Sequence, residues 1–260
     1  MFTIKFEEFI YNLKQLILKF LKKILQIIRK GGFKSWPTMS YEIWFFLQFI
    51  LINEKPEKLV EFGSGKSTYY LGEYSQKYNK VFYSIEQNFM YFLRIWLGLR
   101  HGFIKYCFLI FVPIKGDWFD INKLKKIKGL KNADFLFIDG PGGALNRGSR
   151  NSKGGLSFLK EYFSNSSIII IDDLQRKDIK TFTNKFISKR NDFFYLLFTY
   201  TIDTHHQMNN LILFCLKKET IEKYLDFLKF TKIENSIMFQ TDNFDDLFQF
   251  LIQHKHSLEN

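Results

Sequence analysis

The stretch LVEFGSGKSTYYL, residues 59–71, decides the fold of this chain. Its first residues are typical of a buried strand and its last residues of a helix. Between them, Gly63 and Gly65 let the backbone turn tightly and approach a ligand without a Cβ in the way. Ser67 and Thr68 are suited to the start of a helix, where free N–H groups bind ligands. We therefore expect a strand, a ligand-binding turn and a helix.

The turn matches two nucleotide-binding motifs only in part. A phosphate-binding loop of the form G-x-x-x-x-G-K-[ST] needs glycine at position 60, where the chain has Val60. The dinucleotide motif G-x-G-x-x-G needs a third glycine where Thr68 stands. These departures argue against a nucleotide triphosphatase and against a nicotinamide enzyme.

Short apolar runs alternate with helical segments on both sides of the turn. We expect strands at residues 58–62, 81–86, 108–114, 134–139 and 167–173, and helices at residues 41–54, 66–78, 121–131 and 178–190. Two further apolar runs, residues 193–201 and 209–218, are expected to pair as antiparallel neighbours at one sheet edge. The pattern predicts an α/β fold with a doubly wound, mostly parallel, seven-stranded sheet.

Five successive strands each end in an acid or are followed by one. These acids are Glu61, Glu86, Asp117, Asp139 and Asp172. The carboxyl ends of parallel strands meet at one edge, where open α/β sheets bind ligands, so we expect the functional site there. Glu86 follows Gly63 by 23 residues, close to the interval at which an acid meets ribose hydroxyls in dinucleotide-binding folds. The sequence thus predicts a ligand that contains a ribose.

Residues 40 to 217 contain five motifs in the order LVEFGSGKST, VFYSIEQN, KGDW, FLFIDGPGG and IIIIDD. This order resembles the successive motifs of class I methyltransferases, which use S-adenosylmethionine (SAM). The resemblance implies a Rossmann-like fold with SAM as cofactor. In that family the glycine turn lies under the methionine part of SAM, the acid of the second strand holds the ribose, and residues after the third strand contact adenine. Carried over to this chain, the cofactor-binding residues are Glu61, Gly63, Ser64, Gly65, Ser67, Thr68, Glu86, Gln87, Asp117, Trp118 and Asp139.

Within the family, EFGSG-x-ST together with IDGP and IDD is most similar to O-methyltransferases that act on sugars, polysaccharides and small acceptors. The resemblance implies methyl transfer to a hydroxyl of a sugar, surface glycan or small acceptor, as in polysaccharide biosynthesis. No N-P-P-[YF] motif follows the fourth strand, so the chain does not resemble the enzymes that methylate nucleic-acid amino groups. An RNA methyltransferase, favoured only by the charge, and a membrane-docked SAM-fold binding module without catalysis are the alternatives.

Methyl transfer to a hydroxyl requires a group that removes the acceptor proton. Asp139 is predicted for this role, with Asp172 after the neighbouring strand. His205 and His206, in the connection between the last two strands, are alternative bases. A divalent metal held by Asp139 with Asp172 and Asp173 is a further alternative, because it would lower the pKa of a bound hydroxyl.

The formal net charge of +12 and the sequence pI near 9.4 favour an anionic partner, which we expect to be an anionic acceptor or lipid rather than nucleic acid. Cys107 and Cys215 lie in apolar runs and lack the paired spacing of a metal or redox site. These features predict a cytoplasmic protein.

The chain divides into three predicted parts. Residues 1–31 form a basic amphipathic helical extension, residues 32–218 the SAM-binding domain, and residues 219–260 a helical extension packed on that domain. No apolar run in the first part approaches the roughly 20 residues that span a bilayer, and no secretory signal is present. Two interpretations stay open: residues 1–30 pack on protein, or they lie peripherally on the anionic inner face of a membrane.

Overall fold

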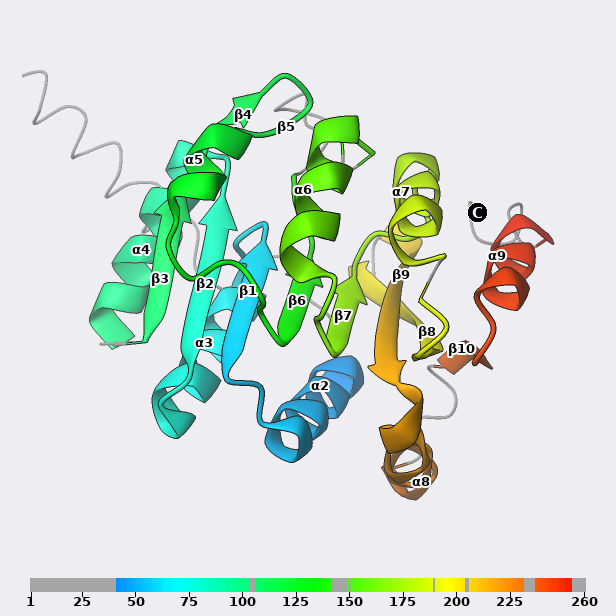
Figure 1. Ribbon diagram of the computed structural model, residues 1–260. Helices are drawn as coiled ribbons and strands as arrows, with labels where there is room; N and C mark the ends of the chain where they lie inside the picture. Colours follow the sequence, from blue (N-terminus) through cyan, green and yellow to red (C-terminus); the bar gives the residue numbers. More distant parts are fainter. Residues whose placement is uncertain are drawn as a thin grey trace, which may run out of the picture. The chain divides into compact units, whose positions relative to one another are not determined.

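The computed structural model describes residues 41–102, 106–141, 149, 151–188, 190–203, 206–231 and 237–253. The predicted basic helix over residues 1–31 lies outside these ranges. Within them, a mixed sheet carries helices on both faces (Figure 1). This confirms the predicted α/β fold with a doubly wound, mostly parallel sheet.

In the described part of the chain, the order of elements is α2 (Tyr41–Glu54), β1 (Lys58–Phe62), α3 (Lys66–Tyr78), β2 (Val81–Glu86), α4 (Phe89–Gly102), β3 (Cys107–Phe111), β4 (Ile114–Lys115), β5 (Trp118–Phe119), α5 (Ile121–Lys126), β6 (Phe135–Ile138), α6 (Lys153–Phe163), β7 (Ile168–Ile171), α7 (Lys177–Ile187), β8 (Phe193–Asp203), β9 (His206–Lys217), the short 3-10 helix η2 (Lys218–Thr220), α8 (Ile221–Thr231), β10 (Ile237–Thr241) and α9 (Phe244–Gln253). The sheet order is β10-β8-β9-β7-β6-β1-β2-β3, and β4 pairs with β5 in a separate hairpin. Strands β3, β2, β1, β6 and β7 are parallel, whereas β9 runs antiparallel to both β7 and β8.

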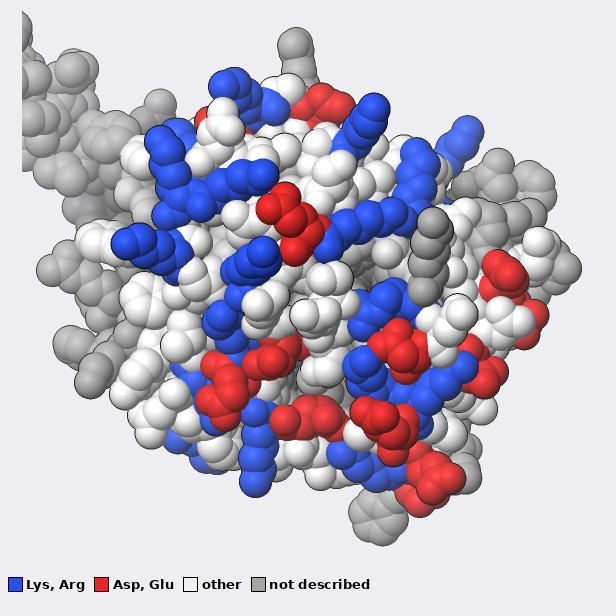
Figure 2. Space-filling model, viewed as in Figure 1, with Lys and Arg blue, Asp and Glu red and all other residues white. Residues whose placement is uncertain are grey.

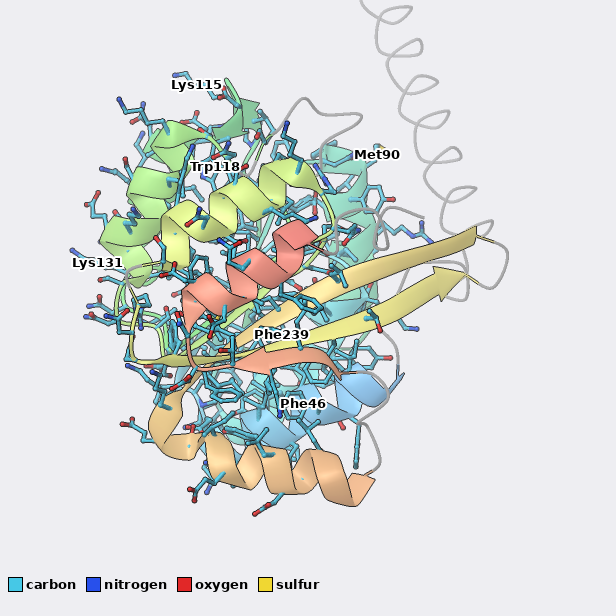
Figure 3. All side chains as sticks on the ribbon, turned by 90° about the vertical axis from the view of Figure 1, so that its right-hand side faces the viewer. Phe46, Met90, Lys115, Trp118, Lys131 and Phe239 are labelled. Carbon is cyan, nitrogen blue, oxygen red and sulfur yellow. The ribbon has the colours of Figure 1, made fainter. Side chains whose placement is uncertain are left out.

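The two cores follow from strand alternation, because successive side chains point to opposite faces of a sheet. In β1, Val60 and Phe62 join the core under α5, α6, α7 and α9, whereas Leu59 joins the core under α2, α3 and α8. Figure 3 shows Trp118 of the first core and Phe46 of the second on opposite sides of the sheet. An acid placed between Val60 and Phe62 therefore faces α3.

All the strands and helices expected between residues 41 and 218 are present, and the four nearest the glycine turn have the bounds that the sequence predicted. Helices α2 and α3 and strands β1 and β2 match residues 41–54, 66–78, 58–62 and 81–86. The helix expected over residues 121–131 is shorter and ends at Lys126. The chain leaves the helix there because Ile127 is extended and Gly129 has a φ of +101°, in the left-handed region that favours glycine.

The C-terminal part differs from the helical extension that we expected. Residues Ile237–Thr241 form β10, which pairs antiparallel with β8 and gives the described sheet eight strands instead of seven. The hairpin β8–β9 pairs as predicted, but β10 rather than this hairpin occupies the sheet edge. An apolar strand edge has unpaired N–H and C=O groups, and β10 satisfies those of β8.

Basic and acidic side chains are interspersed over the face that Figure 2 shows. On α5, Lys125 pairs with Glu161 of α6 at 3.3 Å, and both side chains are about half exposed. The lysines of α5 therefore belong to a solvated helix surface. Among the described helices, none combines the length and the apolar character needed to cross a bilayer.

Arg190 connects the loop after α6 with the start of β8. Its Nη1 donates to the Ser164 carbonyl at 2.6 Å and its Nη2 to the Ser166 carbonyl at 3.1 Å. Its Nε also donates to Asp192 at 3.0 Å, and the guanidinium lies 4.1 Å from the centre of the Phe193 ring. One side chain thus supplies donors to two backbone carbonyls and one carboxylate.

We expect Arg190→Ala to lower the free energy of unfolding by about 2 kcal/mol, because charge-assisted hydrogen bonds are lost and carbonyls are left unpaired. Urea denaturation followed by circular dichroism measures this loss. Lys125→Ala is the control, since it removes an exposed ion pair worth about 0.5 kcal/mol. Equal losses of unfolding free energy in the two variants would contradict the stabilising role of the Arg190 hydrogen bonds.

Candidate functional site

The turn between β1 and α3 lies at the carboxyl ends of the parallel strands (Figure 1). Gly63 has a φ of +93°, in the left-handed region that favours glycine. A Cβ at this position would lie 2.7 Å from the backbone nitrogen of Gly140, in the loop after β6. The Gly63 amide also donates to the Ile85 carbonyl of β2 at 2.9 Å. A side chain at position 63 would therefore push the turn away from the neighbouring strand ends.

The Glu61 carboxyl group is fully buried beneath the turn. Its Oε1 accepts a hydrogen bond from Ser67 Oγ at 2.5 Å, and its Oε2 accepts from Thr68 Oγ1 and Ser84 Oγ, each at 2.6 Å. These donors belong to α3 and β2, so one side chain holds three elements together. The Glu61 and Thr68 side chains are both 0% exposed. The structure therefore places them beneath the turn, which they support, and their part in cofactor binding stays a prediction.

Glu86 ends β2 and lies beside the same turn. Its Oε2 accepts from the Ser64 amide at 2.9 Å and its Oε1 from the Asn88 amide at 2.6 Å. The Ser64 and Ser84 hydroxyls lie 2.7 Å apart, and Ser84 also donates to Glu61. Two carboxyl groups from neighbouring strands are thus connected through Ser64 and Ser84.

Burial raises the pKa of both carboxyl groups from 4.5 to about 7. For Glu61, the hydrogen bonds from the surrounding hydroxyls counteract burial in part. For Glu86, the amides of Asn88 and Ser64 counteract it, while the nearby Glu61 raises the pKa further. Both carboxyl groups therefore hold a proton more tightly than an exposed glutamate does.

Gln87 follows Glu86 and was also predicted as a cofactor-binding residue. Its Oε1 is buried, and it has no hydrogen-bond partner among the residues that the structure describes. Buried polar atoms are nearly always paired in folded proteins. The residue that follows Glu86 thus has a buried acceptor without a partner among the described residues.

Asp117 and Trp118 were both expected to contact adenine. Asp117 is exposed at the tip of the β4–β5 hairpin, and its carbonyl accepts from the Ser149 amide at 2.6 Å. Trp118 is only 1% exposed and packs against Phe62, with ring centres 6.0 Å apart. A Cβ on Gly155 of α6 would lie 2.4 Å from the indole. In this structure α6 and β1 enclose the Trp118 ring in the core, and its contact with a ligand stays a prediction.

Asp139 and Asp172 follow the adjacent strands β6 and β7. The Asp139 amide donates to the Phe62 carbonyl at 2.8 Å, and the Asp172 amide donates to the Ile138 carbonyl at 3.0 Å. The sheet therefore brings both acids to the edge where the glycine turn lies. Asp172 is 7% exposed, and one of its carboxyl oxygens accepts from the Asp173 amide at 2.8 Å.

His205 lies outside the described residues, and of His206 only the backbone is described, at the start of β9. No group of three His, Cys, Asp or Glu side chains is arranged to hold a metal within the described ranges.

Ser84 is a site residue that the sequence analysis missed. Its signal was a polar residue inside the apolar strand VFYSIE, two positions before Glu86.

No protein-family profile and no curated protein sequence matches this chain. Among solved structures, cofactor-bound Rv0187 from MTB is similar, with a TM-score of 0.53, 12% identity and coverage of 76% of this chain and 89% of that chain. The O-methyltransferase from Bacillus cereus in complex with SAH has a TM-score of 0.49 and 14% identity, with coverage of 76% and 90%. SAH-bound Podospora anserina methyltransferase PaMTH1 has a TM-score of 0.48 and 14% identity, with coverage of 76% and 87%.

Five parallel strands continue into an antiparallel hairpin, with β9 placed between β7 and β8. The chain has the same fold as cofactor-bound Rv0187. Within this fold, the glycine turn, Glu86, Asp139 and Asp172 all lie at the carboxyl edge of the sheet, as predicted.

We expect the stability of the folded chain to decrease as the pH rises from about 4.5 to about 7. The folded-state pKa of Glu61 lies above its ordinary value, so folding takes up protons in this interval, and the stability is highest below it. Glu61→Gln removes one titrating group and should flatten this decrease. Urea denaturation at several pH values measures the slope, with Glu161→Gln, an exposed carboxyl group, as the control. If Glu61→Gln shows the same dependence of stability on pH as the wild type, the raised pKa of the buried Glu61 carboxyl group is contradicted.

Proposed function

We propose that this chain is a SAM-dependent O-methyltransferase that transfers a methyl group to a hydroxyl of a sugar, a glycan or a related small acceptor. The observation that carries the proposal is the Glu86 carboxyl group, held by the Ser64 amide of the glycine turn at the carboxyl edge of the sheet. An acid at the end of the second strand beside a glycine turn is suited to bind the hydroxyls of a ribose.

The residues of this edge fit an adenosine-containing cofactor. Glu86 offers a carboxylate to the ribose hydroxyls, and the buried Gln87 Oε1 is an acceptor still to be paired. Because Gly63 and Gly65 have no side chains, the turn leaves room for the methionine part of SAM. Asp117 is exposed and can contact the adenine amino group. When bound, SAM supplies an electrophilic methyl group.

Asp139 is the proposed base for the acceptor hydroxyl. Its backbone is fixed to β1 through the Phe62 carbonyl, and the contact of Gly63 with Gly140 sets its position next to the glycine turn. A carboxylate held there can orient the acceptor oxygen and take its proton. Asp172, after the adjacent strand, is proposed to stabilise the acceptor from the other side or, with Asp139 and Asp173, to hold a divalent cation.

The acceptor is proposed to be anionic because the chain carries a formal net charge of +12. The proposals of a peripheral membrane contact through residues 1–30 and of His205 as an alternative base concern residues outside the described ranges. On the face shown in Figure 2 acids interrupt the basic side chains, so that face offers no continuous basic track for RNA.

SAM or its product S-adenosylhomocysteine (SAH) should bind with at least micromolar affinity. Glu86→Ala should weaken this binding by roughly 1.5–3 kcal/mol, because charge-assisted hydrogen bonds to the ribose are lost. Isothermal titration calorimetry measures both values, with Glu161→Ala as a control that changes an exposed acid on α6. Absence of heat with either ligand, or an unaltered affinity in Glu86→Ala, would remove the basis of the proposal.

Asp139→Asn should lower the turnover rate about 10²–10⁴-fold, the range of a general base. The affinity for SAH should change much less, because Glu86, Ser64 and Gln87 lie on other strands and loops. Single-turnover methyl transfer to an identified acceptor measures the rate, with and without a chelator. A chelator-sensitive wild-type rate would favour a metal at Asp139, whereas a wild-type rate in Asp139→Asn would show that another group is the base.

A further inference from the structure

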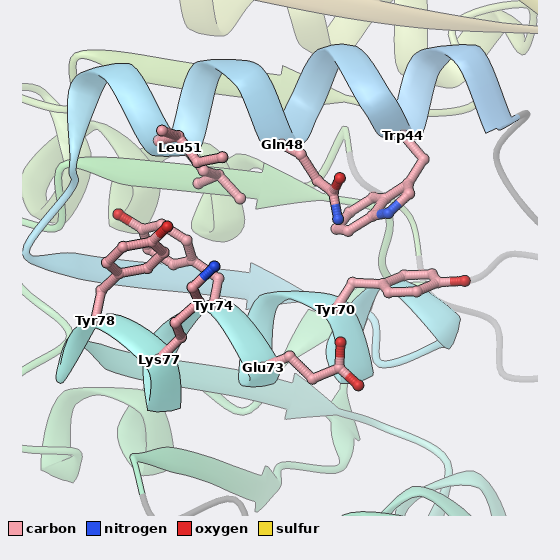
Figure 4. A pocket seen from close by; sticks show the side chains of 9 residues that line it. Trp44, Gln48, Leu51, Tyr70, Glu73, Tyr74, Lys77 and Tyr78 are labelled. Atoms are coloured by element: carbon pink, nitrogen blue, oxygen red, sulfur yellow. The ribbon is translucent and has the colours of Figure 1, made fainter.

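A cavity lies between α2 and α3, within the part of the chain that the structure describes (Figure 4). Its volume is about 240 Å³. The side chains that line it are Trp44, Gln48, Leu51, Ile52, Tyr70, Glu73, Tyr74, Lys77 and Tyr78. None of them belongs to the glycine turn or to the acids at the strand ends, so the cavity is separate from the site described above.

The spacing of the sequence explains why aromatic rings gather here. Tyr70, Tyr74 and Tyr78 follow one another at intervals of four residues on α3, and residues at this interval share one face of a helix. On α2, Trp44 and Gln48 have the same interval and face α3. Trp44 stacks on Tyr70 with ring centres 4.1 Å apart. Tyr74 and Tyr78 form a second pair at 4.9 Å.

The rim of the cavity is polar and has balanced charge. Gln48, Glu73 and Lys77 are exposed there, and Glu73 and Lys77 carry opposite charges one helical turn apart. Lys77 Nζ lies 5.3 Å from the centre of the Tyr78 ring. An organic cation would have to displace this lysine, and an anion would meet Glu73. The lining therefore favours an uncharged ligand.

We propose that this cavity binds a neutral sugar ring. A pyranose has apolar C–H faces, which match aromatic walls, and hydroxyl groups, which match the amide of Gln48 and the charged groups of Glu73 and Lys77. An alkyl chain fits this lining less well, because it would desolvate the polar rim without giving it hydrogen bonds. Tyr74 contributes its ring to the cavity wall, whereas its hydroxyl is buried without a partner among the described residues.

The cavity extends toward the edge that carries the proposed active site. Trp44 lies in the first turn of α2, which leads back to the amino end of β1, and Tyr70 lies near the start of α3, just after the glycine turn. The stacked pair of Trp44 and Tyr70 therefore lies at the end of the cavity that is nearer the carboxyl ends of the strands (Figure 4). If the proposed methyl transfer to a glycan holds, a remote sugar unit of the acceptor can bind here and add to its affinity.

Binding is tested on the full chain with the methyl glycosides of glucose, galactose and N-acetylglucosamine, by saturation-transfer NMR and titration. We expect at least one glycoside to saturate with a dissociation constant of about 1–10 mM, the range of a single small ring. Gln48→Ala should weaken it about three- to tenfold, as for one lost hydrogen bond. Gln76→Ala, which changes an exposed glutamine of α3 outside the cavity, should leave it unchanged.

A second pair of variants tests the aromatic wall. Tyr70→Ala should abolish saturation, whereas Tyr70→Phe, which keeps the ring stacked on Trp44, should retain it. The proposal is overturned if no glycoside saturates up to about 50 mM, if Gln48→Ala binds like the wild type, or if 1-hexanol alone occupies the cavity. SAH titration of the same samples separates the two proposals. If SAH binds and no glycoside binds, only the proposal of a sugar site is contradicted. If a glycoside binds and SAH does not, only the proposal of a methyltransferase is contradicted.

Discussion

The buried carboxyl group of Glu61 is the constraint on which the site depends. A carboxyl group with no exposed surface must be hydrogen-bonded, or its burial would cost several kcal/mol. Ser84 is its register partner on β2, and Ser67 and Thr68 come from the first turn of α3. These bonds fix the register of two strands and the start of a helix together. The three residues that remain between β1 and α3 can then only form a tight turn.

That turn sets the positions of the acids at the carboxyl edge of the sheet. Its Ser64 amide meets Glu86 on one side, and its Gly63 backbone touches Gly140 on the other. The contact with Gly140 holds the loop that begins with Asp139 against the turn, so the proposed ribose acid and the proposed base are positioned by the same three residues. Both glutamates are buried and support the turn: Glu61 accepts from side chains of α3 and β2, and Glu86 accepts from the Ser64 and Asn88 amides at the end of β2.

Helix α3 supports the glycine turn with one surface and lines the aromatic cavity with another. Its first turn points Ser67 and Thr68 at Glu61, and its tyrosines at intervals of four residues face α2. Because one rigid helix carries both sets of side chains, the aromatic cavity keeps a fixed relation to the glycine turn.

The sequence by itself determined the elements around the turn, since glycine spacing and apolar periodicity are local properties that fix α2, β1, α3 and β2 to the residue. It also determined which acids follow the parallel strands. Only the tertiary structure decided what those acids and rings contact: Trp118 is enclosed by α6, Glu61 is covered by α3, and Ile237–Thr241 becomes a strand because β8 offers it an edge. Burial and edge pairing depend on elements distant in the chain, and a local pattern carries no information about them.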